Sequence, residues 1–232
     1  MAGEGFSLKS REEVVRFEEL LDKYMVARSI FAPSHISLAS AFDQLQTRPD
    51  GMRVFTALFD IQINFFLLFL DSHSVGVTWT EVFAKGKLEG GSILDSEAKF
   101  FGKMDVHRFN SAYVLRYRAL WDKLMGLIVL TEAPAEYESF MGARSRKKDF
   151  RRIAEKHQIA NAEFLDSLEG LITRFDNTFR TSEAHGTGRL RKYSLSMESM
   201  VDNPQIELIG FWNAMNGFIA EIGKKFGNVS KS

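Results

Sequence analysis

Arg180 and His185 are the pair of residues whose types and spacing best suit proton transfer at a phosphate group. An imidazole titrates near neutral pH and can accept or donate a proton, and a guanidinium holds phosphate oxygens through forked hydrogen bonds. Side chains five positions apart point about 140° away from each other around an unbroken α-helix. We therefore expect His185 at the exit of a helix, with Gly186 at the position after the cap.

Polar and basic neighbours could extend this site. Asn177 and Glu183 lie three positions on either side of Arg180, so both could face and orient it on a helix. Basic side chains neutralise the phosphates of a nucleic-acid backbone, and two basic stretches could do so together if they are adjacent. The candidate RNA-binding residues are Arg144, Arg146, Lys147, Lys148, Arg151, Arg152, Arg189, Arg191 and Lys192.

Each of these residues also has a structural interpretation, and both interpretations stay open. Arg180 could pair with Asp176 one helical turn earlier, and His185 could cap the last carbonyl groups of its helix. The basic run from residue 144 to residue 152 could be a solvated helix surface. Arg152 and His157 have the same spacing as the first pair, but they lie in a densely charged segment that we expect to be exposed.

The segment Arg180-Thr-Ser-Glu-Ala-His185 has the Arg-x4-His form of the HEPN motif. HEPN domains are α-helical, and many are metal-independent ribonucleases. The helices expected between Val106 and Phe226 resemble the bundle that carries this motif. The resemblance covers roughly the C-terminal half of the chain. It implies that Arg180 and His185 are active-site residues, that RNA is the substrate, and that a homodimer brings two copies of the motif into one cleft.

Several other chemistries are excluded by residue type or spacing. The chain has no cysteine, which removes disulfides, thiolate nucleophiles and cysteine-ligated metals. The five histidines are scattered, and the sequence lacks the His-Glu-x-x-His, P-loop, Gly-x-Gly-x-x-Gly and Gly-x-Ser-x-Gly patterns. We therefore expect no metal and no cofactor. Thirty basic residues balance thirty acidic ones, so any attraction to nucleic acid must come from a local patch.

Two features bear on location. The N-terminus has no basic segment followed by an apolar one, so no signal peptide is expected. The most apolar stretch, Ile61 to Leu70, is shorter than the roughly 20 residues that cross a bilayer. With the absence of cysteine, these features predict a cytoplasmic protein with no membrane partner.

Helical periodicity recurs along most of the chain. Capping boxes begin helices at Ser10-Arg-Glu-Glu13 and Thr78-Trp-Thr-Glu81. Val75 to Trp79 and Tyr193 to Met197 could be short extended pieces. Besides a short helix that starts at Thr78 and stops by Gly86, helices are expected over residues 11–28, 37–46, 52–72, 106–130, 136–141, 146–157, 161–182 and 204–226.

These elements predict an all-α fold, a bundle of long and mostly antiparallel helices with short helices in the connections. We expect a single domain over residues 1–232, made of an N-terminal helical extension (1–105) and a HEPN-like core (106–226). Two functions follow: a metal-independent endoribonuclease, or a non-catalytic dimeric module that binds a protein partner or a nucleotide. Exposure of Arg180 and His185 in a cleft would favour the enzyme, and burial of either in a salt bridge would favour the module.

Overall fold

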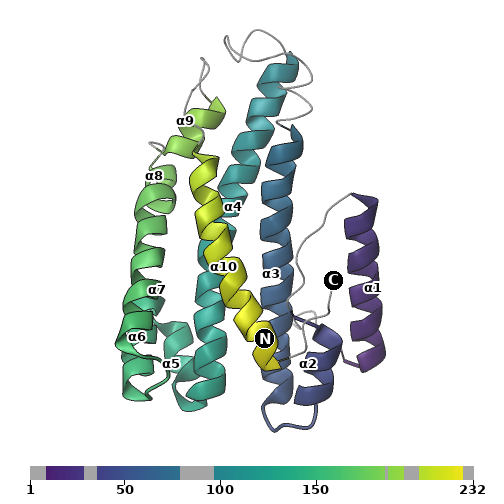
Figure 1. Cartoon of the computed structure of the whole chain (residues 1–232), viewed down its shortest axis with the longest axis vertical. Coiled ribbons are helices and arrows are strands. Elements are labelled where there is room, and N and C mark those ends of the chain that lie inside the picture. Colours follow the sequence, from purple (N-terminus) through teal and green to yellow (C-terminus); the bar gives the residue numbers. More distant parts are fainter. Residues whose placement is uncertain (1–8, 29–35, 79–96, 186–187, 196–203, 227–232) are drawn as a thin grey trace. The chain divides into compact units, whose positions relative to one another are not determined.

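A computed structural model describes residues 9–28, 36–78, 97–185, 188–195 and 204–226. Every regular element in these ranges is a helix, and the long helices pack in the manner of a bundle (Figure 1). The predicted all-α class is therefore confirmed.

The chain divides into two compact units. Unit 1 comprises Met1–Phe66 and Ala214–Ser232, and unit 2 comprises Leu67–Asn213. The boundaries fall inside α3 (Gly51–Thr78) and α10 (Gln205–Phe226), so each of these helices contributes to both units. The division into an extension and a core at residues 105 and 106 stays a prediction, and α4 (Glu97–Glu132) runs through that position as one helix.

Unit 1 contains α1 (Arg11–Ala27), α2 (Leu38–Leu45) and the first part of α3. The predicted capping box at the start of α1 is present, because the Ser10 side chain accepts from the backbone N–H of Glu13. The carboxylate of Glu18 accepts the backbone N–H of Leu38 at 2.7 Å, which joins α1 to the first turn of α2.

Unit 2 is built around α4. Tyr117 is fully buried at the centre of this helix, and its ring centroid lies 4.2 Å from that of Phe175. Its hydroxyl donates to the backbone oxygen of Phe211 in α10 at 3.0 Å. The remaining elements are η2 (Pro134–Glu136), α5 (Tyr137–Gly142), α6 (Arg146–Lys156), α7 (Ala162–Phe175), η3 (Asp176–Arg180), α8 (Thr181–Ala184) and α9 (Arg189–Leu195).

Short helices cover the two ends of α4 and α7. In Figure 1, α5 and α6 lie at one end of these helices, and α8 and α9 lie at the other. The α9 helix is joined to α4 by side-chain hydrogen bonds: Lys103 Nζ donates to the backbone oxygen of Tyr193 at 3.1 Å, and Asn110 Nδ2 donates to Ser194 Oγ at 3.3 Å.

Both predicted extended pieces are wrong within the described residues. Residues 75–78 continue α3, and residues 193–195 belong to α9. Val75 and Tyr193 are buried together with Val106 in one apolar cluster, so packing between helices overrides their β-propensity. Trp79, residues 196–197, Gly186 and the short helix predicted after Thr78 lie outside the described residues.

The α3 helix is longer than expected. Among the described helices, it is the one long and apolar enough to cross a membrane, although Ile61 to Leu70 by itself is too short. In its most apolar 18-residue stretch, 44% of the residues are buried inside the protein.

Candidate functional site

Arg180 and His185 lie at the end of a long helical run formed by α7, η3 and α8. The last helical residue is Ala184, and His185 is the C-cap, with its backbone N–H donating to the oxygen of Thr181 at 3.2 Å. The expectation that His185 stands at a helix exit is therefore confirmed. Both Arg180 and His185 are exposed.

A π-helical turn interrupts the predicted continuous helix. In η3, the backbone N–H of Thr181 donates to the oxygen of Asp176, five residues earlier. Phe175 and Phe179 remain fully buried on the side of the core, while Arg180 points to solvent. Single π turns inside α-helices are frequent at functional sites.

An acidic side chain lies beside Arg180, as the structural interpretation expects. Arg180 Nη1 lies 3.7 Å from Asp176 Oδ1, and the arginine side chain is 51% exposed. The other carboxylate oxygen of Asp176 accepts from Arg118 Nε of α4 at 3.3 Å. Exposed pairs of this kind contribute at most about 1 kcal/mol. Asp176 therefore holds the guanidinium of Arg180 only weakly.

Glu183 connects α8 to α9. Its carboxylate accepts the backbone N–H groups of Leu190 at 2.9 Å and Arg191 at 3.1 Å, which caps α9. Burial raises the pKa of Glu183, although the two N–H groups act in the opposite direction. A Cβ atom at Gly188 would lie 1.9 Å from Glu183 Oε1, so glycine leaves room for this cap. The orienting role of Glu183 and Asn177 toward Arg180 stays a prediction; the Glu183 carboxylate caps α9, and Asn177 is exposed on η3.

The cap places basic residues of α9 near His185. Arg191 and Lys192 are exposed on this helix. Arg189 forms an ion pair with Glu207 of α10. The exposed basic residues described in this part of the site are therefore Arg180, Arg189, Arg191 and Lys192, and the first two of them have an acidic partner.

The basic run of α6 lies in a different setting. Arg151 contacts three carboxylates: Glu155 at 2.9 Å, Asp166 at 2.7 Å and Glu169 at 3.1 Å. The neighbouring Arg152 pairs with Asp149 at 2.8 Å. Acidic side chains of α6 and α7 thus neutralise much of the run.

Of the other basic residues in this run, two donate hydrogen bonds within the protein and two are exposed. Lys147 Nζ donates to Thr173 Oγ1 at 2.6 Å, and Arg146 Nη2 donates to the backbone oxygen of Met141 at 3.4 Å. Arg144 and Lys148 are exposed.

The two basic stretches are far apart. The contacts of α6 with α7 reach Thr173, and His185 lies twelve residues further on, about 18 Å along a helix axis. Figure 1 shows α6 and α9 at opposite ends of the α7–α8 run. The structure therefore brings the basic residues of α9 to the Arg180–His185 end and leaves the α6 run at the other.

The second Arg–His pair has acidic neighbours. His157 Nε2 lies 3.5 Å from Glu136 Oε1, and Lys156 also pairs with Glu136. The hydrogen bonds of Glu136 with Lys156 and with His157 lower the pKa of its carboxyl group. Arg152 and His157 thus provide a comparison pair with the same spacing in another environment.

Arg118 is the residue that sequence reasoning missed at this site. It reaches Asp176 and also Asp122 at 2.5 Å, and it lies 58 positions before Asp176. No local pattern links residues at this separation, because packing of α4 against η3 creates the contact. Within the described part of the chain, no group of three or more His, Asp or Glu residues is arranged to hold a metal ion.

The resemblance to HEPN domains stays a prediction from the sequence. Comparison of the chain with known protein families, with curated proteins and with solved structures gives no match.

Proposed function

We propose that this protein is a HEPN-like, metal-independent endoribonuclease with Arg180 and His185 as its catalytic pair. The observation that carries the proposal is the exposure of both side chains at one helix end, after a π turn and beside the cationic surface of α9. An imidazole and a guanidinium at such a position can both reach a phosphodiester.

Each residue has a defined task in the proposed reaction. The imidazole of His185 accepts the proton of a ribose 2′-hydroxyl, and the 2′-oxygen attacks the adjacent phosphorus. The bond from phosphorus to the 5′-oxygen breaks, giving a 2′,3′-cyclic phosphate. The leaving 5′-oxygen takes a proton from water, and the imidazolium of His185 returns its proton to solvent. The guanidinium of Arg180 stabilises the negative charge that develops on the phosphoryl oxygens.

Other residues would bind and align the RNA. Arg191 and Lys192 would contact backbone phosphates next to the cleaved bond, and the Glu183 cap would hold their helix in place. The proposal includes a homodimer in which two copies of the motif share one cleft.

The alternative is a non-catalytic interaction module, which the Arg180–Asp176 pair favours. In that case Arg180 stabilises the π turn and His185 only ends its helix. The two functions differ in what happens when either side chain is removed.

The test is cleavage of single-stranded RNAs of varied sequence in EDTA. We expect Arg180→Ala and His185→Ala each to lower the cleavage rate by about 10²- to 10³-fold. The circular dichroism spectrum and thermal midpoint should change little, since both side chains are exposed.

The double variant Arg152→Ala/His157→Ala is the matched control. It removes the same residue types at the same spacing, and it should retain cleavage. If the wild-type protein cleaves none of the RNAs, the interaction module is the better description. If the control pair proves essential while Arg180 and His185 are dispensable, the site is wrongly assigned.

A further inference from the structure

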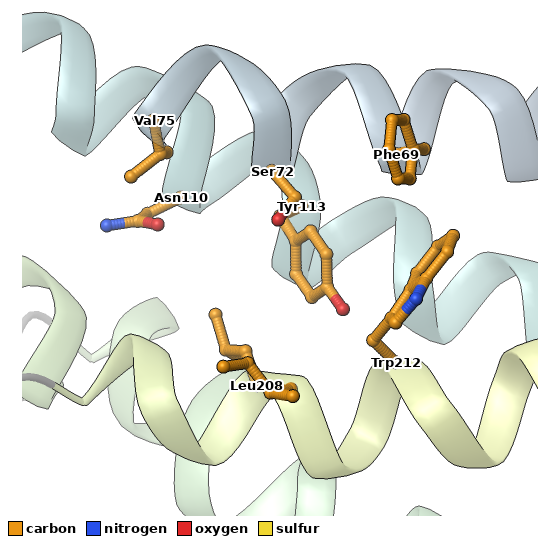
Figure 2. Close-up of a pocket in the computed structure, with 8 residues that line it drawn as sticks. Phe69, Ser72, Val75, Asn110, Tyr113, Leu208 and Trp212 are labelled. Atoms are coloured by element: carbon orange, nitrogen blue, oxygen red, sulfur yellow. The ribbon is translucent and has the colours of Figure 1, made fainter. Parts of the chain in front are cut away.

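A pocket of about 250 Å³ lies within unit 2, between the last part of α3, α4 and the first part of α10 (Figure 2). Its location is separate from the elements that carry Arg180 and His185. The lining residues are Phe69, Ser72, Val75, Asn110, Tyr113, Leu208, Ile209 and Trp212.

The walls of the pocket are apolar and largely aromatic. Phe69 and Trp212 lie against each other at one side, with ring centroids 5.4 Å apart, and Figure 2 shows the Tyr113 ring between them and Asn110. Val75 and Leu208 are buried. None of the lining side chains is charged.

The hydroxyl of Tyr113 is the distinctive polar group of the pocket. The residue is only 2% exposed, and its hydroxyl has no hydrogen-bond partner among the described residues. Figure 2 shows this hydroxyl directed into the space between Leu208 and Trp212. A buried hydroxyl without a partner has lost its hydrogen bonds to water, and a ligand that hydrogen bonds to it restores one of them.

The pocket is open to a ligand from solvent. Ser72 is exposed, and Ile209 at the rim is 58% exposed. Trp212 is half-buried, so one part of its indole faces the pocket and another part faces the surface.

Size and lining together define the class of ligand. A dry apolar cavity of about 150 Å³ holds one benzene ring, so the present pocket has room for two fused rings. Typical ligand pockets begin at about 300 Å³, which excludes drug-sized molecules. An ionised group would lose its hydration without gaining a charged partner from the lining residues.

We propose that this pocket binds a small neutral aromatic compound of about two rings, with one hydroxyl or carbonyl group that hydrogen bonds to the Tyr113 hydroxyl. The aromatic walls supply the apolar contact area, and Tyr113 selects ligands that carry the polar group. The inference does not depend on the ribonuclease activity.

Calorimetric titration tests the proposal with three probes that share one ring system. The probes are 2-naphthol, naphthalene and 2-naphthoate. We expect one molecule of 2-naphthol to bind per chain, more tightly than naphthalene, and 2-naphthoate to bind most weakly. Tyr113→Phe should weaken 2-naphthol binding about five- to tenfold and leave naphthalene binding unchanged. Tyr137→Phe in α5 is the matched control and should change neither.

Two further variants test the location. Val75→Phe should fill the pocket and abolish binding of both neutral probes, provided that circular dichroism shows a folded protein. Ile209→Trp changes an exposed rim residue and should weaken binding without disturbing the core. The proposal is overturned if neither neutral probe binds saturably, if 2-naphthoate binds as tightly as 2-naphthol, or if Tyr113→Phe leaves 2-naphthol binding unchanged.

Discussion

Tyr113 and Tyr117 lie one turn apart on α4, with ring centroids 6.0 Å apart and both rings buried, but their hydroxyl groups differ in their partners. The hydroxyl of Tyr117 donates to the oxygen of Phe211, whereas that of Tyr113 faces the pocket without a partner among the described residues. Two residues of one type, equally buried on one helix, therefore make different contributions to stability. The difference arises from what the neighbouring helix α10 offers to each hydroxyl.

Removing the two hydroxyls should have different effects on stability. Tyr117→Phe loses a buried hydrogen bond and should lower the free energy of unfolding by about 1–2 kcal/mol. Tyr113→Phe removes an unsatisfied polar group and should leave the free energy of unfolding unchanged or raise it by up to about 1 kcal/mol. Urea unfolding followed by circular dichroism measures both, and equal destabilisation by the two substitutions would contradict the assignment of partners.

Glu183 should make stability depend on pH. Burial raises its pKa in the folded chain above the ordinary value of 4.5, so the folded chain binds this proton more readily than the unfolded chain. The stabilising effect of protonation is fully present below about pH 4.5 and is lost as the pH rises through the folded-state pKa.

Glu183→Gln removes this titration. The free energy of unfolding of the wild-type chain minus that of the variant should decrease between pH 4 and pH 7. The decrease should be under about 1 kcal/mol, because the carboxyl group is only half-buried. Urea unfolding at several pH values measures the difference. A difference that grows with pH would show that the hydrogen bonds to α9 outweigh the burial.

At the scale of the elements, side chains and glycines set where helices begin and how they join. Glu18 caps α2 and Glu183 caps α9, and each carboxylate comes from a neighbouring helix. Gly51 begins α3 next to the end of α2, where a Cβ atom would lie 1.6 Å from the backbone oxygen of Leu45. Gly170 is an exposed residue of α7.

Alanine at these two glycines should have opposite effects. Gly51→Ala should lower the free energy of unfolding by more than about 2 kcal/mol, since the backbone of α2 must move to admit the methyl group. In contrast, the site of a Cβ atom at Gly170 has no neighbouring atom within 4 Å among the described residues. Gly170→Ala should therefore raise the free energy of unfolding by up to about 1 kcal/mol through helix propensity. Thermal and urea unfolding of both variants provide the comparison, and destabilisation by Gly170→Ala would contradict the open space beside this glycine.

At the scale of the whole molecule, the question is whether two chains associate. Most side chains of residues 52–70 are buried or half-buried, and Met52 is 39% exposed. Larger exposed fractions occur on α4 and α10: Leu115 is 66% exposed and Ile206 is 66% exposed. Apolar surface available to a second copy is therefore present on these two helices.

We expect the protein to form a homodimer of two-fold symmetry, as the proposed shared cleft requires. Light scattering at tens of micromolar should give twice the chain mass of 26.4 kDa. A strictly monomeric mass would remove the shared cleft from the proposed mechanism. It would leave the ligand pocket unaffected, since all of its lining residues belong to one chain.

The sequence by itself determined the helical class, most helix positions and the end of the Arg180–His185 helix. These features depend on local information: apolar residues that recur at helical spacing, a capping box at Ser10–Glu13, and residues that end helices. Each of these patterns involves residues within one or two helical turns of each other. It therefore predicts a helix or a helix end without information about residues that are distant in the sequence.

Only the tertiary structure decided which partners the side chains have. It continued α3 through Val75, because that residue is buried with Val106 and Tyr193. It neutralised Arg151 with carboxylates of α7, so a run that is strongly basic in sequence is much less so in space. It also assembled the pocket around Tyr113 from three helices that are distant in the chain. Charge pairing and cavities depend on which faces of separate helices meet. The spacing of residues along one helix does not specify which helices pack against it or which of their faces they present.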